Sequence, residues 1–388
     1  MCPRISSFPD IRFQILPNAS QRSVTVSTES DVNKSLNSIE LEAIGQPLAK
    51  VGRVLDLAVA DDQVKVTVEL GVPVKSAADS IRAQIASELR RMTGVASVSV
   101  DLKIKISAHA VQGALKPIPG IRNIIAIASG KGGVGKSTVA VNVALALAAE
   151  GAAVGLLDAD IYGPSQPHML GLAGQQPVSE DGKTMLPLRG HGLQVMSIGF
   201  LVDADQPMVW RGPMVTTALN QLMHQTEWQD LDYLIVDMPP GTGDIQLTLS
   251  QKVPVSGAVI VTTPQNIATL DARKGLAMFR KVAIPVLGVV ENMSTHICSS
   301  CGHEEAIFGS GGADKIVADF EVPLLGRLPL DARIQQQTDS GLPTVIAEPD
   351  SDIAEAYRRT AMRIAIAQAA QRTDYTSKFG SIVVEGSQ

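Results

Sequence analysis

Residues 130–138 read Gly130-Lys131-Gly132-Gly133-Val134-Gly135-Lys136-Ser137-Thr138 and are the strongest indication of the fold in the sequence. It fits Gly-x-x-x-x-Gly-Lys-[Ser/Thr], in which glycines let successive backbone N–H groups turn inward around the oxygens of a nucleotide phosphate. The apolar run at 124–128 predicts a buried strand before the loop, and a helical face follows at Val139, Val143 and Leu147. The nine loop residues are therefore expected to bind ATP, with Lys136 on the β- and γ-phosphates and Ser137 on Mg²⁺.

The segment after residue 121 alternates predicted strands with predicted helices, which is typical of a doubly wound, mostly parallel sheet. Apolar runs that predict buried strands lie at 153–157, 194–198, 233–236, 258–261, 286–290 and 324–326. We therefore predict an α/β fold of the P-loop ATPase type. Ligands of such a sheet bind beyond the carboxyl ends of the strands, so polar residues at those ends are the candidates for a site.

Carboxylates follow two of these predicted strands. Asp158 and Asp160 come after one of them, and Asp237 ends another. A carboxylate at a buried strand end needs a partner, and Mg²⁺ beside a nucleotide, bound directly or through water, supplies one. The alternative for each is an N-cap at a strand-to-helix turn, and for Asp158 both interpretations stay open. Asp244 is not assigned to the site.

The composition is that of an ordinary globular protein with two or three domains. The 388 residues are 45% apolar and 19% charged, which leaves enough apolar material for a sizeable core. A net charge of −6 and 3% aromatic residues give little basis for binding nucleic acid. No apolar run approaches the roughly 20 residues that span a bilayer, and three cysteines make no secreted disulfide framework. We expect a cytoplasmic protein that binds neither nucleic acid nor membrane.

Composition and pattern divide the chain into five segments. Residues 1 to about 30 are Ser/Thr-rich with few acids, which faintly resembles a transit peptide, although a disordered tail is the simpler interpretation. Pro117 and Pro119 mark a linker. The expected segments are a tail at 1–32, a small α/β domain at 33–110, the linker at 111–122, the ATPase domain at 123–372 and a C-terminal tail at 373–388.

The small domain is predicted from alternating and helical patterns. Strands are expected at 53–60, 64–70 and 95–103, and one helical face is marked by Ile81, Ile85, Leu89 and Met92. Ser76 followed by Asp79 supplies a capping signal for that helix.

This block, including the run at 89–98, resembles the small iron–sulfur-assembly domain often fused ahead of one ATPase family. It departs from that pattern at 71–78, Gly-Val-Pro-Val-Lys-Ser-Ala-Ala, where the domain usually keeps a cysteine. If that cysteine carries metal in relatives, this domain has lost the function. We interpret it as a docking or structural module.

Lys131 is an additional lysine that an ordinary phosphate loop does not need directly after its first glycine. With it the loop resembles the deviant phosphate-loop group that includes MinD, ParA and the nitrogenase iron protein. The resemblance implies a homodimer in which Lys131 reaches the partner's nucleotide, like an arginine finger. The alternative is a solvated surface charge. The same resemblance implies that Asp160, in the first switch, orients or deprotonates the attacking water, and that Asp237 holds Mg²⁺ through water.

Adenine recognition is assigned to Asn292. This residue follows a predicted strand, and its amide can both donate and accept at the edge of a base. The related ATPases use an asparagine at this place, and the turn at 329–331 resembles their second base-side segment. A plain turn asparagine is the alternative.

Cys298 and Cys301 form a lone C-x-x-C pair. The span 291–303 around them closely resembles the Mrp-type ATPases that carry iron–sulfur clusters, as do two further segments, 160–165 and 209–214. A [4Fe–4S] cluster wants four thiolates, which a two-fold dimer would supply from two copies of the pair. Zinc would accept the same thiolates, with His303 as a further ligand, and a redox dithiol is a third interpretation. His296 and His303 individually are more typical of loop residues.

These patterns and resemblances together predict a carrier that binds and slowly hydrolyses ATP and holds a labile [4Fe–4S] cluster between two subunits. Its cofactors would be ATP, Mg²⁺ and the cluster, and its partners apo iron–sulfur proteins and a cluster-assembly scaffold. A positioning ATPase like MinD or ParA is the main alternative, although the basic helix expected at 357–372 lacks the clean apolar face of a membrane-binding helix. A nitrogenase-type reductase fits poorly, because that class draws its cluster cysteines from separate loops.

Overall fold

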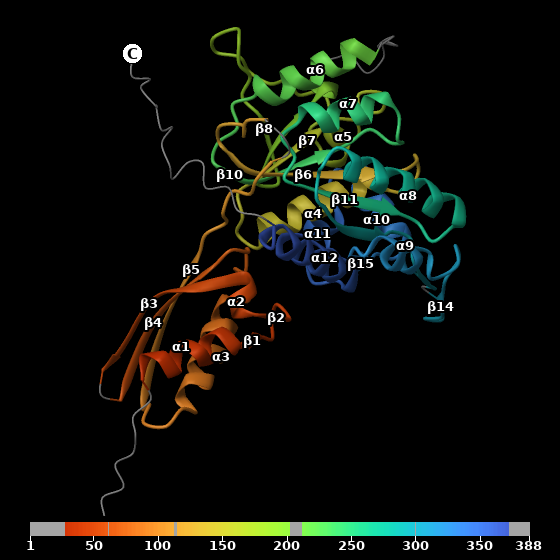
Figure 1. The fold of residues 1–388 in the computed structure, drawn as a ribbon. Coiled ribbons are helices and arrows are strands. Elements are labelled where there is room, and N and C mark those ends of the chain that lie inside the picture. Colours follow the sequence, from red (N-terminus) through yellow and green to blue (C-terminus); the bar gives the residue numbers. More distant parts are fainter. Residues whose placement is uncertain (1–27, 61, 112–114, 202–211, 299, 372–388) are drawn as a thin grey trace, which may run out of the picture.

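The computed structural model describes residues 28–60, 62–111, 115–201, 212–298 and 300–371. These residues form a small N-terminal unit, red to orange in Figure 1, and a larger unit that contains the phosphate loop. Most of the expected N-terminal tail, all of the expected C-terminal tail and the first part of the segment at 209–214 lie outside the described residues.

The larger unit is built on an eight-stranded sheet with the order β15-β12-β11-β6-β10-β7-β9-β8. Every neighbouring pair is parallel except β8 and β9. The strands are β6 Ile121–Ser129, β7 Val154–Asp158, β8 Leu188–Gly190, β9 Leu193–Ser197, β10 Leu231–Asp237, β11 Gly257–Thr262, β12 Val286–Glu291 and β15 Leu324–Arg327. The doubly wound, mostly parallel fold expected from the sequence is confirmed. Antiparallel β8 has no counterpart among the expected strands, because three residues are too few to show a period.

Helices cover both faces of this sheet (Figure 1). Helices α4 and α8 both pack on β6 and β11, and α4 also packs on α11 and α12. The helices of this unit are α4 Lys136–Ala149, α5 Gln166–Met169, α6 Gly212–His224, α7 Asp244–Lys252, α8 Asn266–Lys281, α9 Gly312–Phe320, α10 Ala332–Asp339, α11 Thr344–Ala347 and α12 Asp352–Ala369, with a 3₁₀ turn at Ile198–Phe200. Within the described parts of the chain, no helix is long and apolar enough to cross a membrane.

The central strands are apolar on both sides because helices cover both sheet faces. All residues of β7, β9 and β11 are buried, as are nearly all residues of β6 and β10. Two of these buried residues are charged and lie at strand ends. Asp158 ends β7, Asp237 ends β10, and the two are register partners on neighbouring strands. The parallel pairing therefore brings the two carboxylates together at the edge of the sheet that faces the phosphate loop.

The small unit is a three-stranded sheet with helices on one face. Strands β3 and β4 are antiparallel and β4 and β5 are parallel. Its elements are α1 Glu29–Ser38, β1 Glu40–Leu41, β2 Gln46–Pro47, α2 Leu48–Val51, β3 Gly52–Ala60, β4 Gln63–Leu70, α3 Ala78–Arg90 and β5 Ser97–Ile104. Its core contains fully buried residues from both longer helices, including Val32, Leu36, Ile81, Ile85 and Leu89. The expected strands and helix are present, but α3 ends at Arg90, so Met92, which the pattern placed on the helical face, lies beyond it.

Helix α1 begins at Glu29, inside the segment that composition assigns to the N-terminal tail. The reason is a reciprocal capping box. The Thr28 hydroxyl accepts from the Asp31 N–H, and the Asp31 carboxylate accepts from the Thr28 N–H at 3.1 Å. Together with the burial of Val32 this anchors the helix to the small unit. The small domain therefore extends further toward the N-terminus than the expected boundary at residue 33.

The expected capping role of Ser76 is wrong. The N-cap of α3 is Ala77, and its side chain makes no capping bond. The Ser76 hydroxyl instead donates to the Glu150 carboxylate at 2.7 Å, and the Ser76 N–H donates to it at 3.0 Å. Glu150 lies at the C-cap of α4 in the larger unit, so a tertiary acceptor has replaced the local one.

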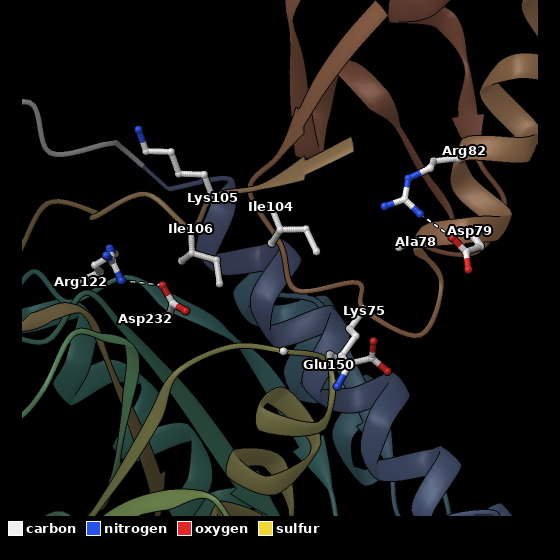
Figure 2. A pocket seen from close by; sticks show the side chains of 11 residues that line it. Lys75, Ala78, Asp79, Arg82, Ile104, Lys105, Ile106, Arg122, Glu150 and Asp232 are labelled. Carbon is white, nitrogen blue, oxygen red and sulfur yellow. Dashed lines mark hydrogen bonds and ion pairs between the residues drawn. The ribbon is translucent and has the colours of Figure 1, made fainter. Parts of the chain in front are cut away.

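The loop at 71–78 is therefore a contact between the two units. The Lys75 N–H also donates to the Glu150 carbonyl at 3.1 Å. A cavity of about 610 Å³ lies beside this contact. Figure 2 shows Lys75 and Arg82 on one side of it and Arg122 and Asp232 on the other. The loop that lacks the cysteine thus packs against the end of the helix that begins at the phosphate loop.

Candidate functional site

The phosphate loop runs from β6 to α4, and three of its glycines, Gly130, Gly133 and Gly135, could not be replaced without a clash or backbone strain. Gly133 and Gly135 have φ values of 80° and 79°, in the left-handed region. A Cβ on Gly135 would lie 2.3 Å from Nδ2 of Asn292, and one on Gly130 would lie 2.1 Å from the backbone of Asp271 in α8. Gly132 and Gly133 have open space in front of them. The loop is packed from behind and open on the side where phosphate oxygens would lie.

Lys136 is the first residue of α4 and is only 6% exposed. Its Nζ lies 2.5 Å from Oδ1 of Asp237, 3.1 Å from Oγ of Ser137 and 3.9 Å from Oδ2 of Asp160. An ammonium group in a buried site needs such partners, because desolvation disfavours an unpaired charge. The structure thus gathers three other residues that the sequence assigned to the site around the positive charge of Lys136.

Asp237 is fully buried, and its two carboxylate oxygens have different donors. Oδ1 accepts from Lys136, and Oδ2 accepts from Nε2 of Gln166 at 2.9 Å. The same Gln166 amide donates to the Ser137 carbonyl at 3.1 Å. Sequence reasoning missed Gln166. Its only signal is its place directly after the segment at 160–165, which carries the resemblance to the Mrp-type ATPases.

Asp158 is fully buried and organises the loop that follows β7. Its carboxylate accepts from the N–H groups of Asp160, Ser165 and Gln166 at 3.0–3.2 Å and from the Ser197 hydroxyl at 3.2 Å. Burial, followed by the nearby Asp237 charge, raises the pKa of Asp158 to about 7, although the N–H donors act in the opposite direction. The N-cap of α5 is Ser165, so Asp158 does not occupy the N-cap position that the sequence left open, although its carboxylate accepts from the N–H groups of Ser165 and Gln166.

Asp160 lies beside this loop and keeps part of its surface in solvent, with 14% of its side chain exposed. Burial raises the pKa of its carboxyl group, while the Lys136 ammonium lowers it and the Asp237 charge raises it. A carboxylate with a raised pKa is a stronger base than a free one. The position and basicity of Asp160 suit a group that accepts a proton from water or orients it.

Asn292 lies in a small cavity next to the phosphate loop. Its Nδ2 donates to the Val134 carbonyl at 2.9 Å, and only 5% of the residue is exposed. The cavity has a volume of about 170 Å³ and is lined by Gly135 and Thr138 from the loop and by residues from both expected base-side segments, Asn292, Met293, Pro329, Leu330 and Asp331. The structure therefore brings together the two segments assigned to adenine.

Lys131 lies at the open side of the phosphate loop and is partly exposed. The Ser129 hydroxyl donates to its carbonyl at 2.9 Å. None of the described residues forms an ion pair with its ammonium group.

The cysteine pair lies on a short hairpin between β12 and α9. Strands β13 His296–Ile297 and β14 Glu304–Glu305 pair antiparallel, and the Cys298 N–H donates to the His303 carbonyl at 2.9 Å. Cys301 is exposed and Cys298 is partly exposed. Backbone N–H groups of Ser300 and Cys301 that point at the sulfur lower the pKa of Cys298. The hairpin presents two thiols to solvent, one of them with a stabilised thiolate.

The histidines near this hairpin have different positions. Nδ1 of His296 donates to the Leu330 carbonyl at 2.9 Å, which fixes the ring against the adenine-side segment. The His303 side chain is exposed. Within the described residues no group of three or more His, Cys, Asp or Glu side chains could hold a metal ion.

The doubly wound sheet, the glycine loop and the buried lysine with its carboxylates define a P-loop nucleotide-binding protein. A family model described as the NUBPL iron-transfer P-loop NTPase matches residues 120–365, well over half of the chain. The chain belongs to this family. A second model, of iron–sulfur cluster assembly proteins, matches residues 29–101.

Curated relatives cover most of the chain. It is 54% identical to the iron–sulfur cluster carrier protein of Escherichia coli strain K12 over 79% of this chain and 83% of the relative. It is 46% identical to the protein of the same name from Haemophilus influenzae, over 88% and 92%. The mouse iron–sulfur cluster transfer protein NUBPL is 53% identical over 64% of this chain and 78% of its own.

A solved structure resembles the larger unit. The nucleotide-binding protein of Archaeoglobus fulgidus in complex with ADP is 35% identical, with a TM-score of 0.54. The match covers 61% of this chain and 93% of that protein. The likeness supports the assignment of the larger unit as the nucleotide-binding part of the molecule.

Proposed function

We propose that this protein is an ATP-hydrolysing carrier that assembles a labile [4Fe–4S] cluster between two copies of the chain and transfers it to apo-proteins. The observation that carries the proposal is the combination, in one chain, of a P-loop site with an exposed pair of cysteines on a hairpin. The family and the names of the curated relatives support the transfer of iron–sulfur clusters. Cluster-assembly scaffolds and apo iron–sulfur proteins are the partners that such a carrier needs.

Nucleotide phosphates would bind against the backbone of residues 130–138, with Lys136 moving from Asp237 to the β- and γ-phosphates. Asn292 and the turn at 329–331 would hold the base. Asp160 would accept a proton from the attacking water or orient it. Its partial exposure and raised pKa support this role.

The donor set fits Mg²⁺. The Lys136 ammonium already lies between Oγ of Ser137 and Oδ1 of Asp237, so these two oxygens converge on a position that a positive charge occupies. Hydroxyl and carboxylate oxygens are ligands that Mg²⁺ prefers, and Asp237 would hold it through water. When bound, Mg²⁺ neutralises charge on the phosphates during transfer.

A homodimer would complete both sites. Lys131, without an ion-pair partner among the described residues, would reach the nucleotide of the other copy. Large apolar side chains are exposed on α8 and in the segment after β7: Ile267 and Leu270 of α8 are 68% and 58% exposed, and Tyr162 is 60% exposed. Exposed apolar groups of this kind favour burial against a second surface. One chain offers two hairpin thiols, and a dimer offers the four that the cluster needs.

The decisive experiment is anaerobic reconstitution with iron and sulfide in wild type and in Cys298→Ala/Cys301→Ala. We expect about four irons and four acid-labile sulfides per dimer in the wild type, and neither in the double variant. Nucleotide binding serves as the matched control, because the hairpin lies outside the phosphate loop and the double variant should keep it. Zinc alone, or metal independent of the cysteines, would contradict the carrier function.

Two alternatives make different predictions for the same experiment. A structural zinc site at the cysteine pair predicts tightly held zinc and no labile sulfide. A positioning ATPase predicts ATP-dependent dimers without metal at the hairpin. The lowered pKa of Cys298 and the exposure of Cys301 suit ligands that must accept and release cargo, which favours the carrier.

A further inference from the structure

Gln166 is the first residue of α5 and is fully buried. Its side-chain amide joins two parts of the nucleotide site that are far apart in sequence. Nε2 donates to Oδ2 of Asp237 at 2.9 Å and to the carbonyl of Ser137 at 3.1 Å. A single donor group thus holds the end of β10 against the start of α4.

The orientation of this amide follows from its neighbours. Both atoms near Nε2 are acceptors, a carboxylate oxygen and a carbonyl oxygen, so a flipped amide would place its oxygen against them. With the nitrogen facing the site, Oε1 of Gln166 is buried and has no partner among the described residues. An unpartnered buried oxygen disfavours the folded state, so stability alone does not account for a glutamine here.

The backbone of Gln166 ties the same position to a third segment. Its N–H donates to Oδ2 of Asp158 at 3.1 Å, and the preceding residues, 160–165, form the first switch segment with Asp160 at its start. The P-loop, the switch segment and the end of β10 therefore meet at one residue. A shift in any of these segments would therefore move the donor that holds the Asp237 carboxylate.

We infer that Gln166 is a positioning residue for the divalent cation: by holding Oδ2 of Asp237 it fixes the carboxylate so that Oδ1 faces the cation position beside Ser137. This inference rests on the proposed ATP-dependent function. Gln166 does not touch the nucleotide or the cation. Its effect reaches them through Asp237 and through the carbonyl of Ser137, whose hydroxyl is the other oxygen of the donor set.

The test is the Mg²⁺ dependence of fluorescent-ATP binding in wild type and in Gln166→Leu, which keeps the volume and removes the donor. We expect the half-saturating Mg²⁺ concentration to rise about tenfold, the scale of one charge-assisted hydrogen bond. Affinity measured in EDTA should change by less than about twofold, because the phosphate loop is intact. A purely structural role would lower both affinities together.

A matched control is Gln368→Leu, which removes another fully buried glutamine whose amide oxygen also has no partner. Gln368 lies in α12, and its Nε2 is 3.5 Å from Oδ1 of Asn123. Asn123 lies near the start of β6, at the end of the strand opposite the phosphate loop. It should leave the Mg²⁺ dependence at the wild-type value. An equal shift in both variants would overturn the inference.

A second variant guards against loss of folding. Gln166→Glu keeps the shape and replaces the donor by a carboxylate 2.9 Å from Oδ2 of Asp237, so the Mg²⁺ dependence should shift at least as far as in Gln166→Leu. An unchanged Mg²⁺ dependence in either folded variant, or loss of folding in both, would overturn the positioning role. Absence of ATP hydrolysis in the wild type would contradict the proposed function instead, and the binding measurement would still decide the role of Gln166.

Discussion

The nucleotide site and the cysteine hairpin differ in how completely one chain builds them. In the nucleotide site Asp158, Gln166 and Asp237 are fully buried, and each has donors or acceptors from at least two segments. In the hairpin the thiols face solvent, and the strands that carry them are two residues long. Phosphate chemistry needs fixed charges in a desolvated site, whereas a cargo site needs access. One chain thus buries and pairs most of its nucleotide site, whereas under the proposed function its exposed thiols form a complete cluster site only in a dimer.

The largest expected effect comes from breaking the buried ion pair between Lys136 and Asp237 in the nucleotide site. Lys136→Ala should abolish tight nucleotide binding and also lower the free energy of unfolding without nucleotide by about 3 kcal/mol, because it strands the Asp237 carboxylate. Urea denaturation measures the second effect. The exposed Lys183→Ala is the control and should change stability by less than about 0.5 kcal/mol.

Adding Asp237→Asn to Lys136→Ala separates charge from packing. The double variant should regain about 1 kcal/mol or more over the single one, because the unpaired buried charge is gone. If the loss of stability in the double variant equals the sum of the losses in Lys136→Ala and in Asp237→Asn alone, the two side chains do not interact.

A smaller effect is expected from filling the phosphate loop. Gly135→Ala places a Cβ against the Asn292 amide at a φ of 79°, so nucleotide affinity should fall about tenfold or more. Gly182→Ala is the matched control, since φ is also positive there but nothing lies within 4 Å. It should strain the chain by about 1 kcal/mol and leave affinity unchanged. Equal nucleotide affinities in both variants would mean that the Asn292 contact does not shape the site.

The contact between the two units should respond more weakly. Ser76→Ala removes the hydroxyl that donates to Glu150, so protection of the Lys75 and Ser76 amides against hydrogen exchange should fall about tenfold. Ser80→Ala is the control, because that hydroxyl bonds only within its own helix, to the carbonyl of Ala77 at 2.9 Å. Unchanged protection in Ser76→Ala would show that the units are held together elsewhere.

The smallest expected effect concerns the ionisation of Cys298 in the cysteine hairpin. In Cys2→Ser/Cys301→Ser the pH midpoint for alkylation of Cys298 should lie below the value of about 8.5 for a free thiol. Backbone N–H groups directed at the sulfur stabilise the thiolate, so the thiol ionises at lower pH and reacts faster near neutrality. The reference is a free cysteine derivative in the same buffer. A midpoint at or above that of the reference would mean that the backbone N–H groups of the hairpin do not stabilise the Cys298 thiolate.

Much of the fold could be predicted because its signals are local. The glycine loop, the apolar strands and the carboxylates at their ends are each visible within a few residues, and the parallel register then brings Asp158 beside Asp237. The start of α1 was also visible, as Thr28 and Asp31, but the composition of the segment pointed to a tail. The predicted start of a helix is therefore wrong when the composition of a segment is given more weight than a capping-box signal.

The rest depended on partners far along the chain. Gln166 meets acceptors 29 and 71 residues away, and no pattern in its own segment announces them. Ser76 carries a correct local capping signal, yet a carboxylate 74 residues away takes its hydroxyl. A local rule predicts what a side chain can do, and the tertiary structure decides which acceptor it meets.

The cysteine hairpin comes directly after the segment with Asn292 in the chain. Only five residues lie between Asn292 and Cys298, so the Cα atoms of these two residues cannot lie more than about 22 Å apart in any conformation. Iron–sulfur clusters absorb visible light broadly, and energy transfer to such a chromophore is efficient over distances of this size. Under the proposed function, a nucleotide with a fluorescent base would therefore dim when the hairpin binds a cluster and brighten when the cluster leaves, so the nucleotide site would report optically on the cargo.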